Sequence, residues 1–125
     1  MADIEISDVS KLMKLNSSTL RYYESIGLIT DIKRNASGKR VYSEEDIKWI
    51  EMIGRLRETG MNINKMKKYA QLRKMGDSTI TKRKNIMKEH LEFIENKIEE
   101  LSKSRDYVEK KVEIYTEMEE KMNGR

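Results

Sequence analysis

An apolar side chain recurs at every seventh position over the last third of the chain. One set of heptad positions is apolar throughout, and a second set contains three apolar and three charged residues. This rhythm is typical of a coiled coil, in which charged seam residues fix the register and the number of partners. The first set holds Ile80, Met87, Ile94, Leu101, Val108, Tyr115 and Met122, and the second holds Lys84, Leu91, Ile98, Arg105, Val112 and Glu119.

The repeat predicts one long helix over residues 79–122. At about 1.5 Å per residue it would be a rod about 65 Å long, and the rest of the chain offers too little apolar surface to cover it. The pattern therefore predicts a homodimer, antiparallel or parallel. The residues expected at the dimer interface are Met87, Leu91, Ile94, Ile98, Leu101, Val108, Val112 and Tyr115.

Basic residues are concentrated before this helix. The formal net charge is +4; residues 1–76 carry 15 Lys+Arg and 10 Asp+Glu, whereas residues 77–125 carry 11 and 12. We expect two domains, a compact unit over 1–76 and a coiled-coil dimerisation helix over 77–125. A basic unit attracts phosphate backbones by releasing counterions, although an ordinary solvated surface would show a similar excess.

The composition excludes several classes of protein. Because the chain has no Cys, it forms no disulfide, thiolate metal site or thiol-based redox sensor. It has no apolar run of about 18 residues and no signal peptide at its start, so we expect a cytoplasmic protein with no membrane contact. The one His, His90, lacks a nucleophile partner or a Gly-rich phosphate loop. We expect it at the helix surface, and we predict no enzyme activity, cofactor or metal site.

Two short helices at the start form a helix-turn-helix candidate. The first is predicted over 7–14, and the second begins after the N-cap residue Asn16 and ends near Gly27. In this motif the start of the second helix enters the major groove of DNA. The candidate contact residues there are small or hydrogen-bonding: Ser17, Ser18, Thr19 and Arg21.

A basic loop follows the second helix. Residues 33–39 contain Asn, Ser and Gly, and β-forming residues flank them at 28–29 and 40–42, which predicts a two-stranded wing. Its basic residues, Lys33, Arg34, Lys39 and Arg40, are candidate DNA contacts. The alternative is a solvated hairpin without a ligand.

Two further helices are expected to close over the first two. Ser43 and Asp46 resemble a capping box and open a helix that runs to Gly60, and Asn62 caps another that stops near Gly76. The expected inner side of the first of these helices holds Ile47, Trp49, Ile50, Met52, Ile53 and Leu56. The predicted fold is mainly α, a winged helix-turn-helix domain with a small two-stranded wing, joined to a long C-terminal coiled-coil helix.

Several segments resemble the MerR-type transcription regulators. They are Ile6 to Leu12, Thr19 to Ile29 (with Leu-Arg-Tyr-Tyr-Glu), Arg40 to Ile47 (with Arg-Val-Tyr) and Arg55 to Gly60. The resemblance implies a winged helix-turn-helix joined to an antiparallel coiled-coil dimer. It also implies that the dimer binds a palindrome between promoter elements that are too widely spaced for RNA polymerase. Effector binding then makes the dimer distort the double-stranded operator and realign these elements.

The resemblance also assigns residues by position. Arg21, Tyr22 and Tyr23 match a motif whose arginine and at least one tyrosine contact DNA; core packing is the other possible role, and we expect Tyr23 inside and Tyr22 exposed. Arg40 and Tyr42 match the Arg-x-Tyr of the wing, where the arginine reaches phosphate. Arg57 matches a basic residue that grips the central phosphates, with a plain surface charge as the alternative. The chain departs from the family pattern at Lys14, Lys39 and Thr30-Asp31.

The effector remains open. Metal- and redox-sensing relatives use cysteines, which this chain lacks. A small apolar effector would fit where the rod end meets the partner's DNA-binding unit, beside Tyr107, Tyr115, Met118 and Met122 and near Trp49, Met52 or Tyr69 of the partner subunit. Two alternatives to a regulator are an excisionase-like architectural protein and a module that pairs with a different chain. The long helix argues against the first, and its mixed Lys and Glu favour self-pairing over the second.

Overall fold

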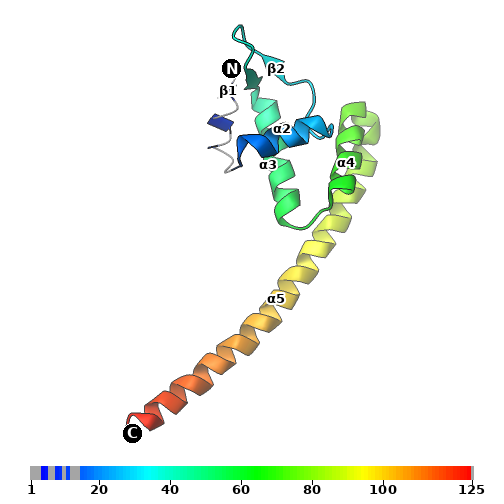
Figure 1. Ribbon diagram of the computed structural model, residues 1–125. Coiled ribbons are helices and arrows are strands. Elements are labelled where there is room, and N and C mark those ends of the chain that lie inside the picture. Colours follow the sequence, from blue (N-terminus) through cyan, green and yellow to red (C-terminus); the bar gives the residue numbers. More distant parts are fainter. Residues whose placement is uncertain (1–3, 6–7, 10, 12–14, 125) are drawn as a thin grey trace. The chain divides into compact units, whose positions relative to one another are not determined.

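The computed structural model describes residues 4–5, 8–9, 11 and 15–124. Its elements, in chain order, are β1 (Ile4–Glu5), α2 (Ser17–Ser25), β2 (Lys33–Arg34), β3 (Arg40–Tyr42), α3 (Glu44–Glu58), α4 (Ile63–Met75), the 3-10 turn η1 (Asp77–Thr79) and α5 (Ile80–Met122) (Figure 1). The predicted fold class is confirmed. The helix predicted over 7–14 lies largely outside the described residues.

Two compact units divide the chain within α5, at Ile86 and Met87. The first unit holds every other element, and the second is the remainder of α5. Within the part of the chain that the structure describes, no helix is long and apolar enough to cross a membrane.

Helix α2 is defined at both ends by side-chain and backbone hydrogen bonds. The Asn16 side chain accepts from the Thr19 amide (2.8 Å) and from the Thr19 (2.7 Å) and Ser18 (2.8 Å) hydroxyls, which confirms it as the N-cap. Gly27, at φ +81°, ends the helix in a conformation that favours glycine. The next two amides, of Leu28 and Ile29, then turn back to the Tyr23 carbonyl, and both side chains enter the core.

The wing belongs to a small antiparallel sheet of order β1-β3-β2. Strands β2 and β3 pair Lys33 with Val41 and Arg34 with Arg40, and the Asn35 side chain accepts from the amides of Ser37 and Lys39 across the turn. The wing therefore begins at Lys33, not at the β-forming pair 28–29, which is buried instead. Strand β1, which pairs with β3, was not predicted.

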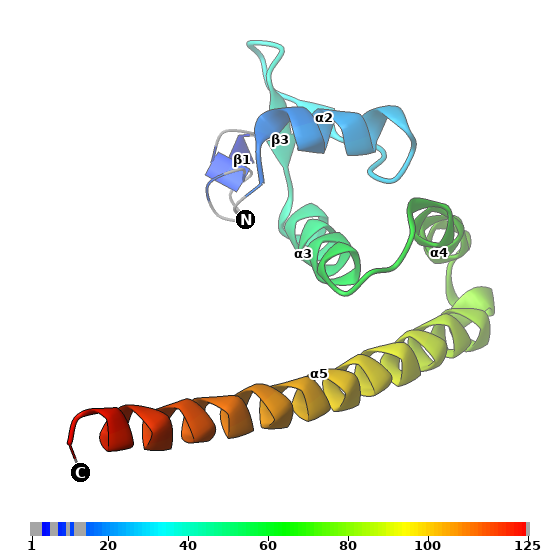
Figure 2. The same ribbon diagram turned by 60° about the horizontal axis from the view of Figure 1, so that its bottom comes forward.

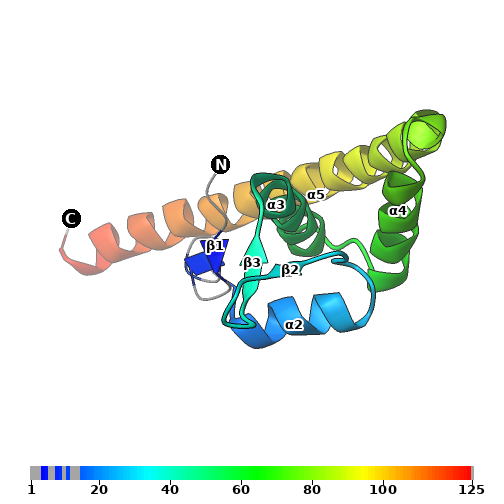
Figure 3. The ribbon, with the colours of Figure 1, turned by 90° about the horizontal axis from the view of Figure 1, so that it is seen from above.

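Helices α3 and α4 complete the core beside α2 (Figures 2 and 3). The capping box of Ser43 and Asp46 and the Asn62 cap are both present. Trp49 is buried as expected; its indole N–H donates to the Leu28 carbonyl (2.9 Å), and its ring stacks on Tyr69. Met52, predicted on the inner side, is exposed, because the buried face of α3 consists of Trp49, Ile50, Ile53 and Leu56.

A buried threonine ties the end of α4 to the start of α5. The Thr79 hydroxyl lies 2.5 Å from the Leu72 carbonyl oxygen and 2.8 Å from that of Gly76. Arg83 donates to the Thr79 hydroxyl through Nε (3.1 Å) and to the Gly76 carbonyl through a terminal nitrogen (3.1 Å). These groups satisfy the Leu72 carbonyl, in the last turn of α4, and the carbonyl of its cap residue Gly76.

Helix α5 runs without interruption for 43 residues, in agreement with the predicted long helix. Its seam side chains are exposed at Leu91, Ile98, Leu101, Val108, Val112 and Tyr115 and half-buried at Met87 and Ile94. His90 was expected at the surface but is 8% exposed, and its ring stacks on Phe93.

Candidate nucleic-acid interface

The first two turns of α2 present a polar surface. Ser18, Arg21 and Tyr22 are exposed, and Ser17 and Thr19 are half-buried. The hydroxyl hydrogens of Ser18 and Thr19 are directed at Asn16, so these side chains offer oxygen lone pairs outward rather than free donors. As expected, the two tyrosines differ: Tyr22 is 53% exposed and Tyr23 is 3% exposed.

A concavity of about 440 Å³ brings Arg57 beside this surface. Its lining residues come from α2, from the end of α3 and from the start of α4: Ser18, Thr19, Tyr22, Tyr23, Arg57, Met61, Ile63 and Met66. Four predicted contact residues of α2 thus share one hollow with Arg57, although the sequence separates them by more than thirty positions. Sequence reasoning did not place Met61, Ile63 and Met66 beside these residues, although all three line the hollow.

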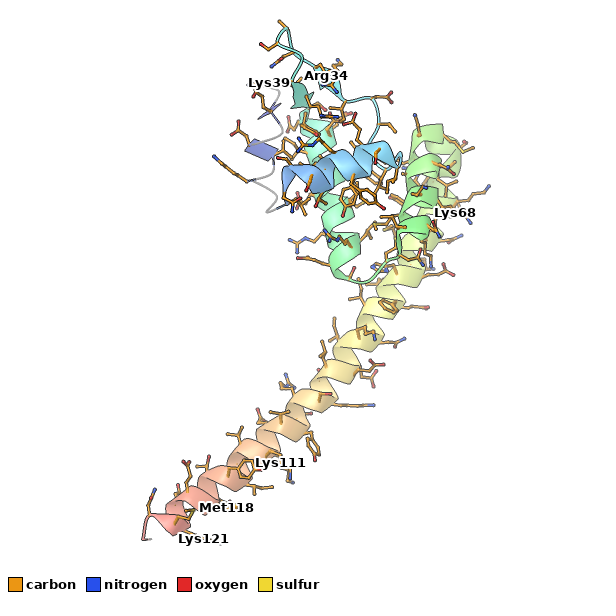
Figure 4. All side chains as sticks on the ribbon, in the orientation of Figure 1. Arg34, Lys39, Lys68, Lys111, Met118 and Lys121 are labelled. Carbon is orange, nitrogen blue, oxygen red and sulfur yellow. The ribbon has the colours of Figure 1, made fainter. Side chains whose placement is uncertain are left out.

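The wing carries exposed positive charge at its turn. Lys33, Arg34 and Lys39 are exposed, and Figure 4 shows Arg34 and Lys39 on the wing. A terminal nitrogen of Arg34 donates to the Gly38 carbonyl (2.8 Å) across the turn. Lys39 Nζ lies 3.9 Å from a carboxylate oxygen of Glu5 in β1, so strand β1 partly balances the charge of the wing.

The Arg-x-Tyr segment of β3 faces inward more than predicted. Arg40 is half-buried, and its Nε donates to Glu24 Oε1 of α2 at 2.6 Å. Tyr42 is 0% exposed, so in this conformation it belongs to the core and does not face a DNA backbone. Burial raises the pKa of the Tyr42 phenol above its ordinary value of 10.0, and the nearby Glu24 carboxylate raises it further.

Metal binding is a further role to consider for the described residues. No group of three or more His, Asp or Glu side chains there could hold a metal ion. The strongest polar features are instead the hydroxyls, tyrosines and guanidinium groups of α2, α3 and the wing. Such groups bind sugar, phosphate and base edges.

A helix-turn-helix followed by a basic wing defines the class of winged DNA-binding proteins. The sequence pattern described as "MerR HTH family regulatory protein" matches residues 4–73, and the pattern described as "MerR, DNA binding" matches residues 47–110. The chain belongs to the MerR family of DNA-binding transcription regulators.

Relatives of known name and structure agree with this assignment. The HTH-type transcriptional regulator AdhR of Bacillus subtilis is 48% identical over 84 residues, which cover 67% of this chain and 60% of AdhR. A MerR family regulator from Bacillus thuringiensis superimposes with a TM-score of 0.81 at 34% identity, over 89% of this chain and 97% of that one. HiNmlR, described as a MerR family regulator lacking the sensor domain and bound to promoter DNA, gives a TM-score of 0.85 at 25% identity, over 93% and 92%.

Proposed function

We propose that this chain acts as a homodimer that binds a palindromic operator in promoter DNA and regulates transcription by distorting it. The observation that carries the proposal is the concavity between α2 and Arg57, in a chain that also has a basic wing and whose last helix exposes an apolar seam. One unit offers groups that grip DNA, and the other offers a surface that a second copy would cover. Because its target is chromosomal DNA, such a regulator would work in the cytoplasm.

We assign the DNA-contacting role to polar residues of α2, α3 and the wing that are exposed or half-buried. These residues are Ser17, Ser18, Thr19, Arg21, Tyr22, Lys33, Arg34, Lys39, Arg40 and Arg57. Tyr23 and Tyr42, which the family motif also suggested, would act from the core by fixing α2 and β3. Arg21, at the exposed start of the recognition helix, is the best candidate to read a base.

Distortion of the operator is the mechanism that family membership favours. A dimer that holds two half-sites while gripping the phosphates between them can bend or untwist DNA at sites it does not read. RNA polymerase would then find the two promoter elements realigned. Arg57, beside the recognition helix, and the arginines of the wing would supply two of the required phosphate contacts.

An apolar effector would need room beside the rod end. Tyr107, Tyr115, Met118 and Met122 are exposed in α5. Of the three residues suggested to meet them from the partner subunit, Trp49 and Tyr69 already stack on each other in the core, and Met52 alone is exposed. Titration of hydrophobic or cationic compounds, followed by Trp49 fluorescence and operator binding, tests for such a ligand; no response to any compound would favour a constitutive DNA-binding factor.

Selection of bound sequences from random DNA tests the main proposal. We expect a palindrome that lies in a promoter spacer.

On that duplex, Arg21→Ala and Arg40→Ala should each abolish tight binding while leaving the dimer intact. Arg40→Ala should weaken all sequences alike and reduce the salt slope by about one, whereas Arg21→Ala should also change sequence preference. Lys48→Ala, an exposed charge on α3, serves as the control. Binding without sequence preference would contradict the proposal and favour an architectural protein.

A further inference from the structure

The shortest ion pair in the described part of the chain joins the recognition helix to the wing. Arg40 Nε donates to Glu24 Oε1 at 2.6 Å, and the two side chains are 24% and 30% exposed. The other ion pairs between separate elements, Lys39 with Glu5 and Lys74 with Asp31, measure 3.9 Å and are more exposed. A short, charge-assisted hydrogen bond that is partly shielded from water holds its geometry far better than an exposed pair.

Glu24 is otherwise badly placed for a carboxylate. It lies in the last turn of α2, where the negative end of the helix dipole opposes negative charge, and this last turn contains no basic residue. It also lies in a unit that would approach phosphate groups, which repel it. Pairing with Arg40 is the interaction in the described structure that offsets both effects.

The pair leaves part of the Arg40 guanidinium available. Its Nε is engaged by Glu24, and its two terminal nitrogens have no hydrogen-bond partner among the described residues. A planar guanidinium can bind one anion through Nε and another through its terminal nitrogens. Tyr42, two residues further along β3, is close enough to both charges for Glu24 to raise and Arg40 to lower its pKa. Helix α2 and strand β3 thus share one polar cluster.

We propose that Glu24 is a positioning residue for operator recognition: it holds Arg40 by Nε, directs the terminal nitrogens of that arginine at a backbone phosphate, and fixes the wing relative to the recognition helix. This inference rests on the proposed function, because it concerns the DNA that the wing and α2 contact. Simple charge repulsion makes the opposite prediction. Removal of a carboxylate from a DNA-facing unit should, by repulsion alone, tighten binding to every sequence.

The test compares a selected palindromic duplex with a scrambled duplex of equal length, using the full chain. For Glu24→Ala we expect operator affinity to fall about tenfold and affinity for scrambled DNA to fall as well, because the Arg40 contact that Glu24 positions is made to phosphate. Glu24→Gln keeps an acceptor for Arg40 Nε and should recover most of the loss. Glu51→Ala removes an equal charge from an exposed position of α3 and should weaken binding to neither duplex. Thermal unfolding and sedimentation verify that each variant is folded and has the same oligomeric state.

A double-mutant cycle shows whether Glu24 acts through Arg40. If it does, Glu24→Ala combined with Arg40→Ala should bind the operator no more weakly than Arg40→Ala alone. Equal or tighter operator binding by Glu24→Ala, or additive losses in the double variant, would overturn the inference. Should Glu24→Ala fail to fold, the same cycle with Glu24→Met decides, because methionine keeps the length of the side chain without a strong acceptor for Arg40 Nε, and additive losses there overturn the inference equally. Absence of operator preference in the wild-type protein would contradict the proposed function itself, so the two failures are distinguishable.

Discussion

Tyr42 places a phenol in the core. Hydrophobic packing alone would not favour this side chain, because its hydroxyl is polar. It is fully buried, and its hydroxyl has no hydrogen-bond partner within the part of the chain that the structure describes. A buried hydroxyl without a partner costs free energy, whereas the ring itself contributes apolar contacts. Phenylalanine should therefore serve the packing role of this side chain equally well.

We expect Tyr42→Phe to keep or raise the free energy of unfolding at neutral pH, by up to about 1 kcal/mol. The raised pKa of Tyr42 also gives the wild type a distinct pH dependence. Below pH 10 both states hold the phenolic proton. Above it the unfolded state releases the proton first, so stability falls as pH rises toward the folded-state pKa. Urea unfolding between pH 8 and about 11 should show this loss in the wild type and less of it in the variant. Equal slopes for the two proteins would contradict the expectation.

At the scale of the element, the two asparagine caps form a natural comparison. Asn16 opens α2 and Asn62 opens α4, each through a 2.8 Å bond to the amide three residues on. The cap of α2 also orients two hydroxyls that we assign to DNA contact. The cap of α4 orients no residue that we assign to DNA contact. The same chemistry therefore supports stability at both helices and recognition at only one.

Asn16→Ala and Asn62→Ala should each lower the free energy of unfolding by about 0.5–2 kcal/mol. Because Ser18 and Thr19 lose their acceptor only in the first variant, Asn16→Ala alone should weaken operator binding beyond the effect of stability. Chemical unfolding and operator titration under conditions where both variants stay folded provide the measurement. Matching operator affinities for the two variants would remove the Asn16 cap from the recognition surface.

The sequence predicted these elements through local signals. A cap residue or a glycine fixes the backbone where a helix begins or ends. The ends of the helices were therefore predicted to within one or two residues from Asn16, Ser43, Asn62 and Gly27. Strand β1 has two residues and no periodicity, so no pattern reveals it. The Arg40–Glu24 pair and the inward orientation of Tyr42 depend on how β3 meets α2, which neighbouring residues do not determine. Arg57 and the residues of α2 were predicted separately as DNA contacts, and their meeting in one hollow was not predicted.

At the scale of the whole molecule, the proposed dimer depends on the seam of α5. Ile98 lies near the middle of the rod and is exposed, as are Leu91 and Leu101 beside it. Ile98→Asp would place a charge in the buried seam of both subunits. Since losing a buried Ile or Leu side chain costs roughly 2–5 kcal/mol per site, we expect monomers at micromolar concentration in sedimentation. Asn96→Asp adds the same charge on the side of the helix opposite the seam and should leave a dimer; a dimeric Ile98→Asp would show that the seam is misassigned.

The charged seam positions give a test of orientation. Lys84 and Glu119 lie toward opposite ends of α5 in the same heptad position. A parallel pair would oppose like charges at both ends, whereas an antiparallel pair would bring each lysine within about one turn of a glutamate of the partner subunit. Lys84→Glu and Glu119→Lys should each weaken the dimer by about fivefold or more, and the double exchange should restore it. A double exchange no better than the single variants would argue against the antiparallel arrangement.

The unbroken course of α5 also constrains how the gene for such a chain can change. Insertion or loss of one codon anywhere in the rod would rotate every later residue by about 100° about the helix axis. The seam beyond that point would then face away from its partner. Only changes of whole heptads, seven codons at a time, keep the stripe on one side of the helix. Related chains should therefore differ rarely in the length of the rod, and then by multiples of seven residues. The wing turn, which ends within a few residues, can tolerate single-codon changes.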